Sequence, residues 1–277
     1  MQTTNKERTA PCRPPVISRP LFAFFSHYFI HYLRRHFNAV RIDRQTPAPV
    51  LSGPTLLYMN HPSWWDPLVA AAIATRFYAD FRHFAPIDAQ ALERYRFMVK
   101  IGFFGIQRNT RRGTVEFLQT SHAILREQNA VLWLTPQGDF TDPRNTDTPL
   151  RPGIGHLAAN IHPLTLIPVA IEYAFWQERL PEAFIRFGTP LLTTARQDRL
   201  NPSIGPTTAA QWISHLAEAL RGQQAALAQN VITRDPARFT TILSGRSGVG
   251  GIYDLARRMN AWRKGRVFFP GHEGPQT

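Results

Sequence analysis

From residue 50 onward, short apolar runs alternate with longer stretches in which apolar side chains recur at helical spacing. The short runs predict strands at residues 56–59, 81–85, 103–106, 131–134 and 166–171, and an edge strand at 184–187. The longer stretches predict helices at residues 67–74, 89–100, 114–126, 156–161 and 209–228. This alternation is typical of an α/β domain, in which helices cover a central sheet.

The N-terminal part of the chain contains an uncharged, largely apolar stretch at residues 20–33. A helix that spans a membrane needs about 20 apolar residues, so this stretch is too short to be one. Basic residues close both of its ends, which favours a helix that lies in the headgroup layer of a membrane. A helix packed on a protein core would show the same apolar stripe. The stripe consists of Leu21, Phe24, Phe25, Tyr28 and Tyr32.

The composition excludes several other classes of protein. Apolar residues make up 43% of the chain and charged residues 18%, which is unlike a disordered protein or a coiled coil. The single cysteine, Cys12, excludes an intrachain disulfide and any cysteine-rich metal site. The 277 residues are enough for one large domain or two small ones.

The formal net charge of +13 lies mostly at the two ends of the chain. Residues 1–49 contain eight basic and two acidic residues, and residues 246–277 contain six basic and two acidic residues. Residues 250–266 also show helical spacing, which predicts a basic amphipathic helix and a second membrane contact. A helix packed on the body, or an arm that binds nucleic acid, would show the same pattern, although no nucleic-acid-binding module accompanies it. We therefore expect a membrane surface with anionic lipids as partner, and no nucleic acid.

The main chemical motif lies where the first predicted strand ends and the next helix begins. His61 is followed five residues later by Asp66, and Pro67 comes next. At this edge of an α/β sheet a histidine can act as a general base, and a carboxylate across a turn can orient the ring and stabilise its charged form. Asp66 has a second interpretation, because aspartate before proline is a frequent N-cap. The spacing alone leaves both interpretations open.

His61 and Asp66 form the first of four motifs whose order and spacing resemble those of the glycerolipid acyltransferases, the superfamily of lysophosphatidic acid and glycerol-3-phosphate acyltransferases. The matches cover about residues 50–175. The expected fold is a single three-layer α/β acyltransferase domain with a central mixed sheet, to which the patterns described above add an N-terminal interfacial helix and a C-terminal basic helix. The other motifs are Phe104-Gly105-Ile106-Gln107-Arg108, Leu134-Thr135-Pro136-Gln137-Gly138-Asp139 and Leu166-Ile167-Pro168-Val169-Ala170-Ile171.

The resemblance also implies a function for each motif. His61 and Asp66 are the expected catalytic residues, and Arg108 is expected to bind a phosphate of the acceptor. The third and fourth motifs add Gln137, Gly138 and Pro168 as expected substrate-binding residues, with Pro168 in a strand that lines the acyl pocket.

The activity implied by the resemblance is the transfer of an acyl group from a thioester, acyl-CoA or acyl carrier protein, to a hydroxyl of a lysophosphatidic acid-like lipid in membrane lipid biosynthesis. We expect no metal and no redox cofactor, and a location at the cytoplasmic face of a membrane. The expected segments are a membrane-contacting segment (1–46), the acyltransferase domain (47–235) and a basic extension (236–277).

The third motif departs from the family pattern in two places. The family has glutamate where this chain has Gln137, and Thr-Arg where it has Asp139-Phe140. The loss of the family's arginine removes one phosphate contact. Asp139 would repel a phosphate unless Arg144 or Arg151 folds back from the loop to compensate. Two alternatives therefore stay open: an acceptor without phosphate, such as a glycolipid, carotenoid or amino-acid lipid, and a catalytically inactive lipid-binding relative.

Overall fold

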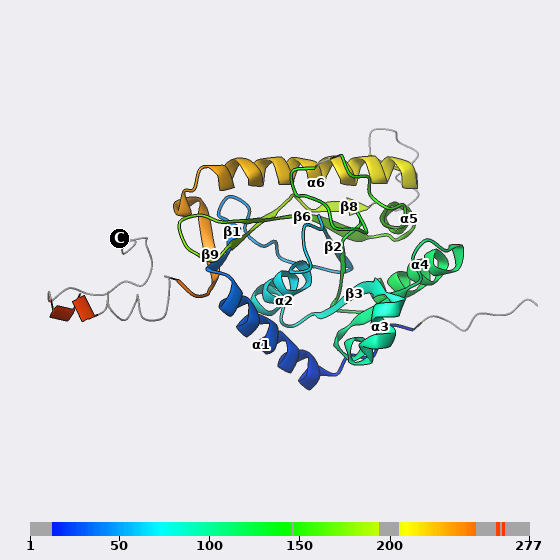
Figure 1. Cartoon of the computed structure of the whole chain (residues 1–277). Coiled ribbons are helices and arrows are strands. Elements are labelled where there is room, and N and C mark those ends of the chain that lie inside the picture. The colour runs from blue at the N-terminus through cyan, green and yellow to red at the C-terminus, as the bar shows by residue number, and fades with distance from the viewer. Residues whose placement is uncertain (1–12, 146, 194–204, 248–258, 261, 264–277) are drawn as a thin grey trace, which may run out of the picture.

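The computed structural model describes residues 13–145, 147–193, 205–247, 259, 260, 262 and 263 (Figure 1). The described strands are β1 (Ala39–Asp43), β2 (Thr55–Met59), β3 (Arg82–Asp88), β4 (Phe103–Ile106), β5 (Ala130–Leu134), β6 (Leu164–Ala174), β7 (Glu182–Phe187), β8 (Leu191–Thr193) and β9 (Phe239–Ser244). The described α-helices are α1 (Arg19–His36), α2 (Asp66–Phe77), α3 (Ala89–Arg94), α4 (Arg111–Leu125), α5 (Gly153–Asn160) and α6 (Ala209–Ile232). The described 3₁₀-helices are η1 (Arg96–Ile101) and η4 (Pro236–Arg238).

These strands form one mixed sheet in the order β4-β3-β5-β2-β6-β7-β1-β9, and β8 pairs with β6 outside this row. The pairs from β4 to β6 are all parallel, whereas β7 is antiparallel to β6 and β9 is antiparallel to β1. The carboxyl ends of β2 and β5 therefore meet at one edge of the sheet, where α/β proteins place their sites.

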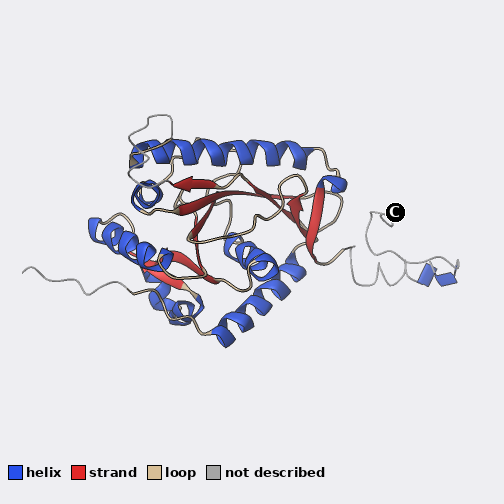
Figure 2. Cartoon of the chain, turned by 180° about the vertical axis from the view of Figure 1, so that it is seen from behind, coloured by secondary structure: helices blue, strands red, loops and turns tan. Residues whose placement is uncertain are grey.

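Alternate side chains of β2 enter two separate cores. Leu57 and Met59 pack in the core under α1 and α2, whereas Leu56 and Tyr58 pack in the core under α4, α5 and α6. Figures 1 and 2 show α6 on one side of the sheet and α1 with α2 on the other. The expected three-layer α/β domain with a central mixed sheet is therefore confirmed.

The strand expected at the edge of the sheet lies in its interior, because β7 is flanked by β6 and β1. The apolar pattern does not predict β1, since two of its five residues are charged and buried. Arg41 forms an ion pair with Glu182 of β7, and Asp43 forms one with Arg186. These partners compensate charges that would otherwise be costly to bury.

The sheet extends beyond the expected body of residues 47–235. Both β1 and β9 lie outside that range and pair within the sheet, so the expected boundaries do not coincide with its limits. The helix expected at residues 89–100 is instead two short helices, α3 and η1, which meet at Tyr95.

The expected N-terminal helix is α1, and its two sides differ. Ser26 and Leu33 are buried against the body, whereas Phe24 is 65% exposed and Tyr28 is 50% exposed. One side thus packs on the core and the other presents aromatic side chains. None of the described helices has the length and hydropathy that crossing a bilayer requires. Apart from residues 259, 260, 262 and 263, the expected C-terminal basic helix falls outside the described residues.

Candidate active site

A buried asparagine fixes the start of the loop that carries His61. Asn60 directly follows β2 and is 1% exposed. Its amide group donates to the carbonyl of Ile171 (2.9 Å) and accepts from the N–H of the same residue (2.8 Å). The side chain therefore continues the pairing of β2 with β6 by one more position and anchors the loop to the sheet.

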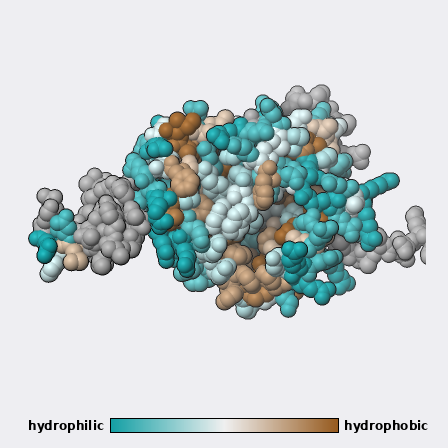
Figure 3. All heavy atoms as spheres, viewed as in Figure 1, coloured by the Kyte–Doolittle hydropathy of each residue, from teal (hydrophilic) through white to brown (hydrophobic). Residues whose placement is uncertain are grey.

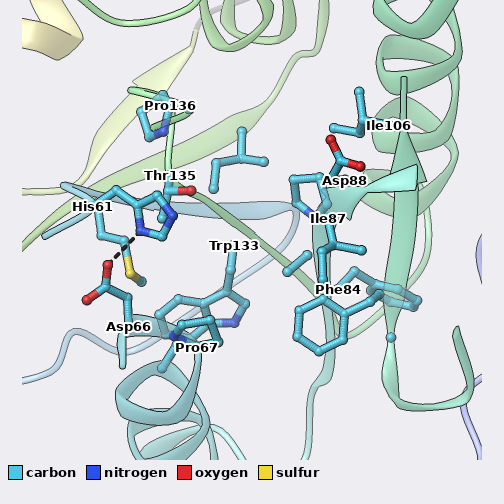
Figure 4. A pocket seen from close by; sticks show the side chains of 18 of the residues that line it. His61, Asp66, Pro67, Phe84, Ile87, Asp88, Ile106, Trp133, Thr135 and Pro136 are labelled. Atoms are coloured by element: carbon cyan, nitrogen blue, oxygen red, sulfur yellow. Dashed lines mark hydrogen bonds and ion pairs between the residues drawn. The ribbon is translucent and has the colours of Figure 1, made fainter. Parts of the chain in front are cut away.

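His61 and Asp66 form a direct pair at the start of α2, with Nδ1 of the histidine 2.6 Å from Oδ2 of the aspartate (Figure 4). The carboxylate is 1% exposed, whereas the imidazole is 19% exposed and lines a cavity. An ionised Asp66 requires the proton of the neutral ring on Nδ1, which leaves Nε2 able to accept a proton from a bound hydroxyl. The geometry is that of a general base with its orienting carboxylate.

The alternative role of Asp66 as an N-cap is wrong. Asp66 is the first residue of α2, the N-cap position belongs to Trp65, and the helix has no side-chain cap. The second hydrogen bond to Oδ2 comes from the N–H of Ser63, within the loop, at 3.2 Å. Asp66 thus organises the His61 loop rather than the helix start.

A tyrosine from β6 completes the surroundings of the carboxylate. The hydroxyl of Tyr173 donates to Oδ1 of Asp66 at 2.7 Å. Burial raises the pKa of Tyr173 well above its usual range, and the charge of Asp66 raises it further, so the hydroxyl stays protonated and remains a donor. Asp66 therefore holds hydrogen bonds from the loop, from His61 and from the sheet.

The loop after β5 holds His61 by its main chain. The side-chain Oε1 of Gln137 accepts from the N–H of His61 (2.7 Å), and the N–H of Thr141 donates to the carbonyl of His61 (2.9 Å). The ring of Phe140 lies 4.5 Å from the imidazole. Gln137 thus positions the histidine, a task that requires only a hydrogen-bond acceptor.

His61 lies in a cavity of about 650 Å³ between the sheet edge and the helices α1, α2 and α4 (Figure 4). Its apolar part contains phenylalanines of α1 and small residues of α2, which leave space between these helices. Its polar part lies at the end of β4, where Arg108 and Arg151 face it. The apolar lining consists of Phe22, Phe25, Phe29, Ala70, Ala71, Ala74, Met98 and Ile101, among others.

The two arginines at the polar end are joined by a carboxylate. Arg108 donates to a side-chain oxygen of Asp139 and to the carbonyl of Gly138, and Arg151 donates to the other side-chain oxygen of Asp139 at 3.0 Å. Gly138 has φ +80°, and a Cβ there would lie 2.0 Å from Nε of Arg151. The turn therefore favours a glycine, and any other residue would also have to displace the side chain of Arg151. The other loop arginine, Arg144, pairs with Asp142 instead.

Pro168 does not reach the cavity, contrary to the expectation that its strand lines an acyl pocket there. It lies opposite Tyr58 in the register of β2 with β6, and its ring packs against Gly188 on the side of α6. The alternation of side chains along a strand explains this placement. Gln137 is likewise absent from the lining formed by the described residues, because its side chain turns toward the main chain of His61.

The structure brings four of the expected site residues to one cavity: His61, Asp66, Arg108 and Gly138. Two residues that support the His61–Asp66 pair were not predicted from the sequence. Tyr173 is 107 positions from Asp66, and no local pattern connects them. Asn60 directly precedes His61, so its place at the end of a strand was an available signal. Among the residues that the structure describes, no cluster of three or more His, Cys, Asp or Glu side chains is suited to hold a metal ion.

Comparison with known families agrees with this geometry. A family model described as acyltransferase matches residues 27–172, which is slightly more than half of the chain. The match runs from within α1 almost to the end of β6 and includes every expected site residue. No curated protein matches the sequence significantly.

Proposed function

This chain belongs to the acyltransferase family, that of the glycerolipid acyltransferases, and from this premise we propose that it transfers a fatty acyl group from a thioester to a hydroxyl of an amphiphilic lipid. The observation that carries the proposal is the His61–Asp66 pair, 2.6 Å apart, in a largely apolar cavity with two arginines at its polar end. An acyl chain suits the apolar part, and a polar headgroup or the phosphates of coenzyme A suit the arginines.

The reaction follows from the orientation of the imidazole. Nε2 of His61 takes the proton of the acceptor hydroxyl while its oxygen attacks the thioester carbonyl, and Asp66 stabilises the imidazolium that forms. A C–O bond forms, the C–S bond breaks, and the proton on Nε2 passes to the departing thiolate. No acyl-enzyme is needed, and Tyr173 keeps Asp66 in place throughout.

Two classes of acceptor have support from different residues. Arg108 and Arg151 support a lysophosphatidic acid-like acceptor, because a guanidinium group binds phosphate in a bidentate manner. Asp139 supports an acceptor without phosphate, since its carboxylate already occupies both arginines. Acyl-CoA and acyl carrier protein are both suitable donors, and no metal or redox cofactor takes part in the proposed steps.

We place the protein at a membrane, at its cytoplasmic face, with α1 in contact with anionic lipids. Figure 3 shows apolar side chains gathered over the region of α1. Phe25 of α1 stacks on Phe97 of η1 with ring centroids 4.6 Å apart, so aromatic side chains of both elements lie together. Exposed Arg34 and Arg35 at the end of α1 supply positive charge. Aromatic side chains beside basic ones are typical of an interfacial helix.

Activity and membrane binding can be tested separately. With acyl-CoA and a lysolipid, Asp66→Asn should lower kcat strongly, although less than loss of His61, because the carboxylate only orients the imidazole and stabilises its charged form.

Deleting residues 1–46 would remove β1, so point variants are the better membrane test. Phe24→Ser with Tyr28→Ser should weaken binding to anionic vesicles about tenfold.

The matched membrane control is Ile232→Ser in α6, on the opposite side of the sheet, where the side chain is also exposed. This control should bind vesicles like the wild type. Co-sedimentation that neither the double α1 variant nor high salt reduces would contradict the membrane assignment.

A further inference from the structure

The two arginines at the polar end of the cavity are already paired with a negatively charged side chain of the protein itself. The carboxylate of Asp139 bridges two guanidinium groups, with one oxygen toward Arg108 and the other toward Arg151. Both arginines line the cavity, as do Gly138 and Phe140 on either side of Asp139 in the sequence, whereas Asp139 is not among the lining residues. Two oxygens shared between two guanidinium groups are an arrangement that a bound phosphate would also make.

The surrounding contacts fix the two arginines in this position. Arg108 also donates to the carbonyl of Gly138, and Arg151 also donates to the side-chain oxygen of Asn109 at 3.0 Å. Hydrogen bonds from Arg108 and from Arg151 lower the pKa of Asp139, so the carboxylate remains ionised at neutral pH. The three side chains together carry a net charge of +1 instead of +2.

The neighbouring residue strengthens the effect of this carboxylate. Phe140 packs its ring 4.5 Å from that of His61 and lines the cavity, so this position provides an apolar contact and no cation. A phosphate monoester, with its charge of about −2 at neutral pH, would have to displace Asp139 or lie beside it. In the first arrangement the phosphate loses the attraction that a free arginine pair would give. In the second, two negative charges lie close together and repel each other.

We propose that Asp139 is a specificity-determining residue that occupies the arginine pair as an internal counter-ion and thereby disfavours acceptors that carry a phosphate monoester. The proposal rests on the acyl transfer proposed above and narrows its acceptor to a lipid with an uncharged or weakly anionic headgroup. The exposure of Asp139, 66% for its side chain, means that the carboxylate competes with a ligand and does not seal the site.

The test compares two acceptors that differ only in the phosphate, lysophosphatidic acid and monoacylglycerol. In Asp139→Asn, the ratio of kcat/KM for lysophosphatidic acid to kcat/KM for monoacylglycerol should rise about tenfold over the wild type, because one charged competitor for the arginines is lost. Asp142→Asn is the matched control, since Asp142 lies in the same loop and pairs only with Arg144 among the contacts described for its side chain. The control should leave the ratio unchanged.

An equilibrium measurement keeps this inference separate from the proposed activity. Glycerol 3-phosphate should bind Asp139→Asn and Asp139→Ala about tenfold more tightly than it binds the wild type, whether or not acyl transfer is observed. The gain should disappear when Arg108→Ala and Arg151→Ala are both added, because the two freed arginines are its cause. Acyl-CoA and a thioester of N-acetylcysteamine as donors show whether any change in kcat/KM comes instead from the phosphates of coenzyme A.

The inference is overturned if both Asp139 variants leave the affinity and the ratio unchanged or lower them, or if the gain persists when both Arg108 and Arg151 are replaced. Failure of the acyl-transfer proposal looks different: neither acceptor is acylated, while glycerol 3-phosphate still distinguishes the Asp139 variants from the wild type.

Discussion

The two ends of the cavity differ in how their charged groups are held. At His61, the carboxylate of Asp66 is buried and receives hydrogen bonds from the imidazole, the loop and Tyr173 of the sheet. At Arg108, the ion pairs with Asp139 are open to solvent and come from loops. Removing one partner of a buried, fully hydrogen-bonded charge has a large energetic cost, whereas exposed ion pairs contribute little free energy. Changes at the first end should therefore abolish the reaction, and changes at the second should alter which substrate reacts.

The largest effect is expected at the buried end. His61→Ala should lower kcat/KM for acyl transfer by at least about 100-fold, because general-base catalysis is worth that much or more. The variant should still fold but unfold at a lower temperature, because the buried carboxylate of Asp66 loses one partner and keeps its hydrogen bonds from Ser63 and Tyr173. Steady-state kinetics and a thermal melt measure the two quantities. Turnover above roughly a tenth of the wild type would show that His61 is not the base.

Tyr173→Phe tests whether the sheet acts on the reaction through Asp66. Removing the hydroxyl leaves a buried carboxylate oxygen without this donor, which should lower kcat about tenfold with little change in KM. Steady-state kinetics measures both constants.

The matched control for this variant is Tyr78→Phe. Tyr78 is also a buried tyrosine, but its hydroxyl donates to the carbonyl of Pro49 at 3.0 Å, away from the cavity. This variant should lose stability and keep its kcat and KM. If Tyr173→Phe changes stability alone, the hydroxyl is structural and does not position Asp66.

This contrast also explains what the sequence could predict. The apolar runs predict β2 and β5 because all of their residues are buried, and motif order places His61 and Arg108 at one edge of the sheet. Patterns fail where buried charges are paired over long distances, as in β1. Sequence patterns could not predict the contacts of Asp66 with Tyr173 and of Asp139 with Arg108 for the same reason, since these contacts depend on strand order and loop path rather than on spacing.

At the exposed end, Arg108→Ala should raise the KM of the acceptor only about threefold while Asp139 is present, because solvent-exposed charge pairs contribute little. Arg108→Lys should be impaired as well, since an ammonium group cannot make a bidentate contact. Varying each substrate in turn locates the defect, and a rise in the KM of the donor alone would assign Arg108 to coenzyme A. Normal constants for both substrates would leave Arg108 without a role in binding. Arg144→Ala, from the loop after β5 that carries Asp139, is the control.

The smallest effect is expected for Gln137→Glu, which restores the glutamate of the family pattern. Gln137 uses its side-chain oxygen to accept from the N–H of His61, and a carboxylate oxygen at the same length accepts that hydrogen bond equally well. We therefore expect kcat/KM within about twofold of the wild type, whereas Gln137→Ala, which leaves the N–H of His61 unpaired, should lose about tenfold. Equal damage in both variants would mean that an uncharged amide is required at this position. The difference between the two variants thus measures how much the hydrogen bond to the main chain of His61 contributes to activity. This chain keeps that hydrogen bond without the charge of the family's glutamate.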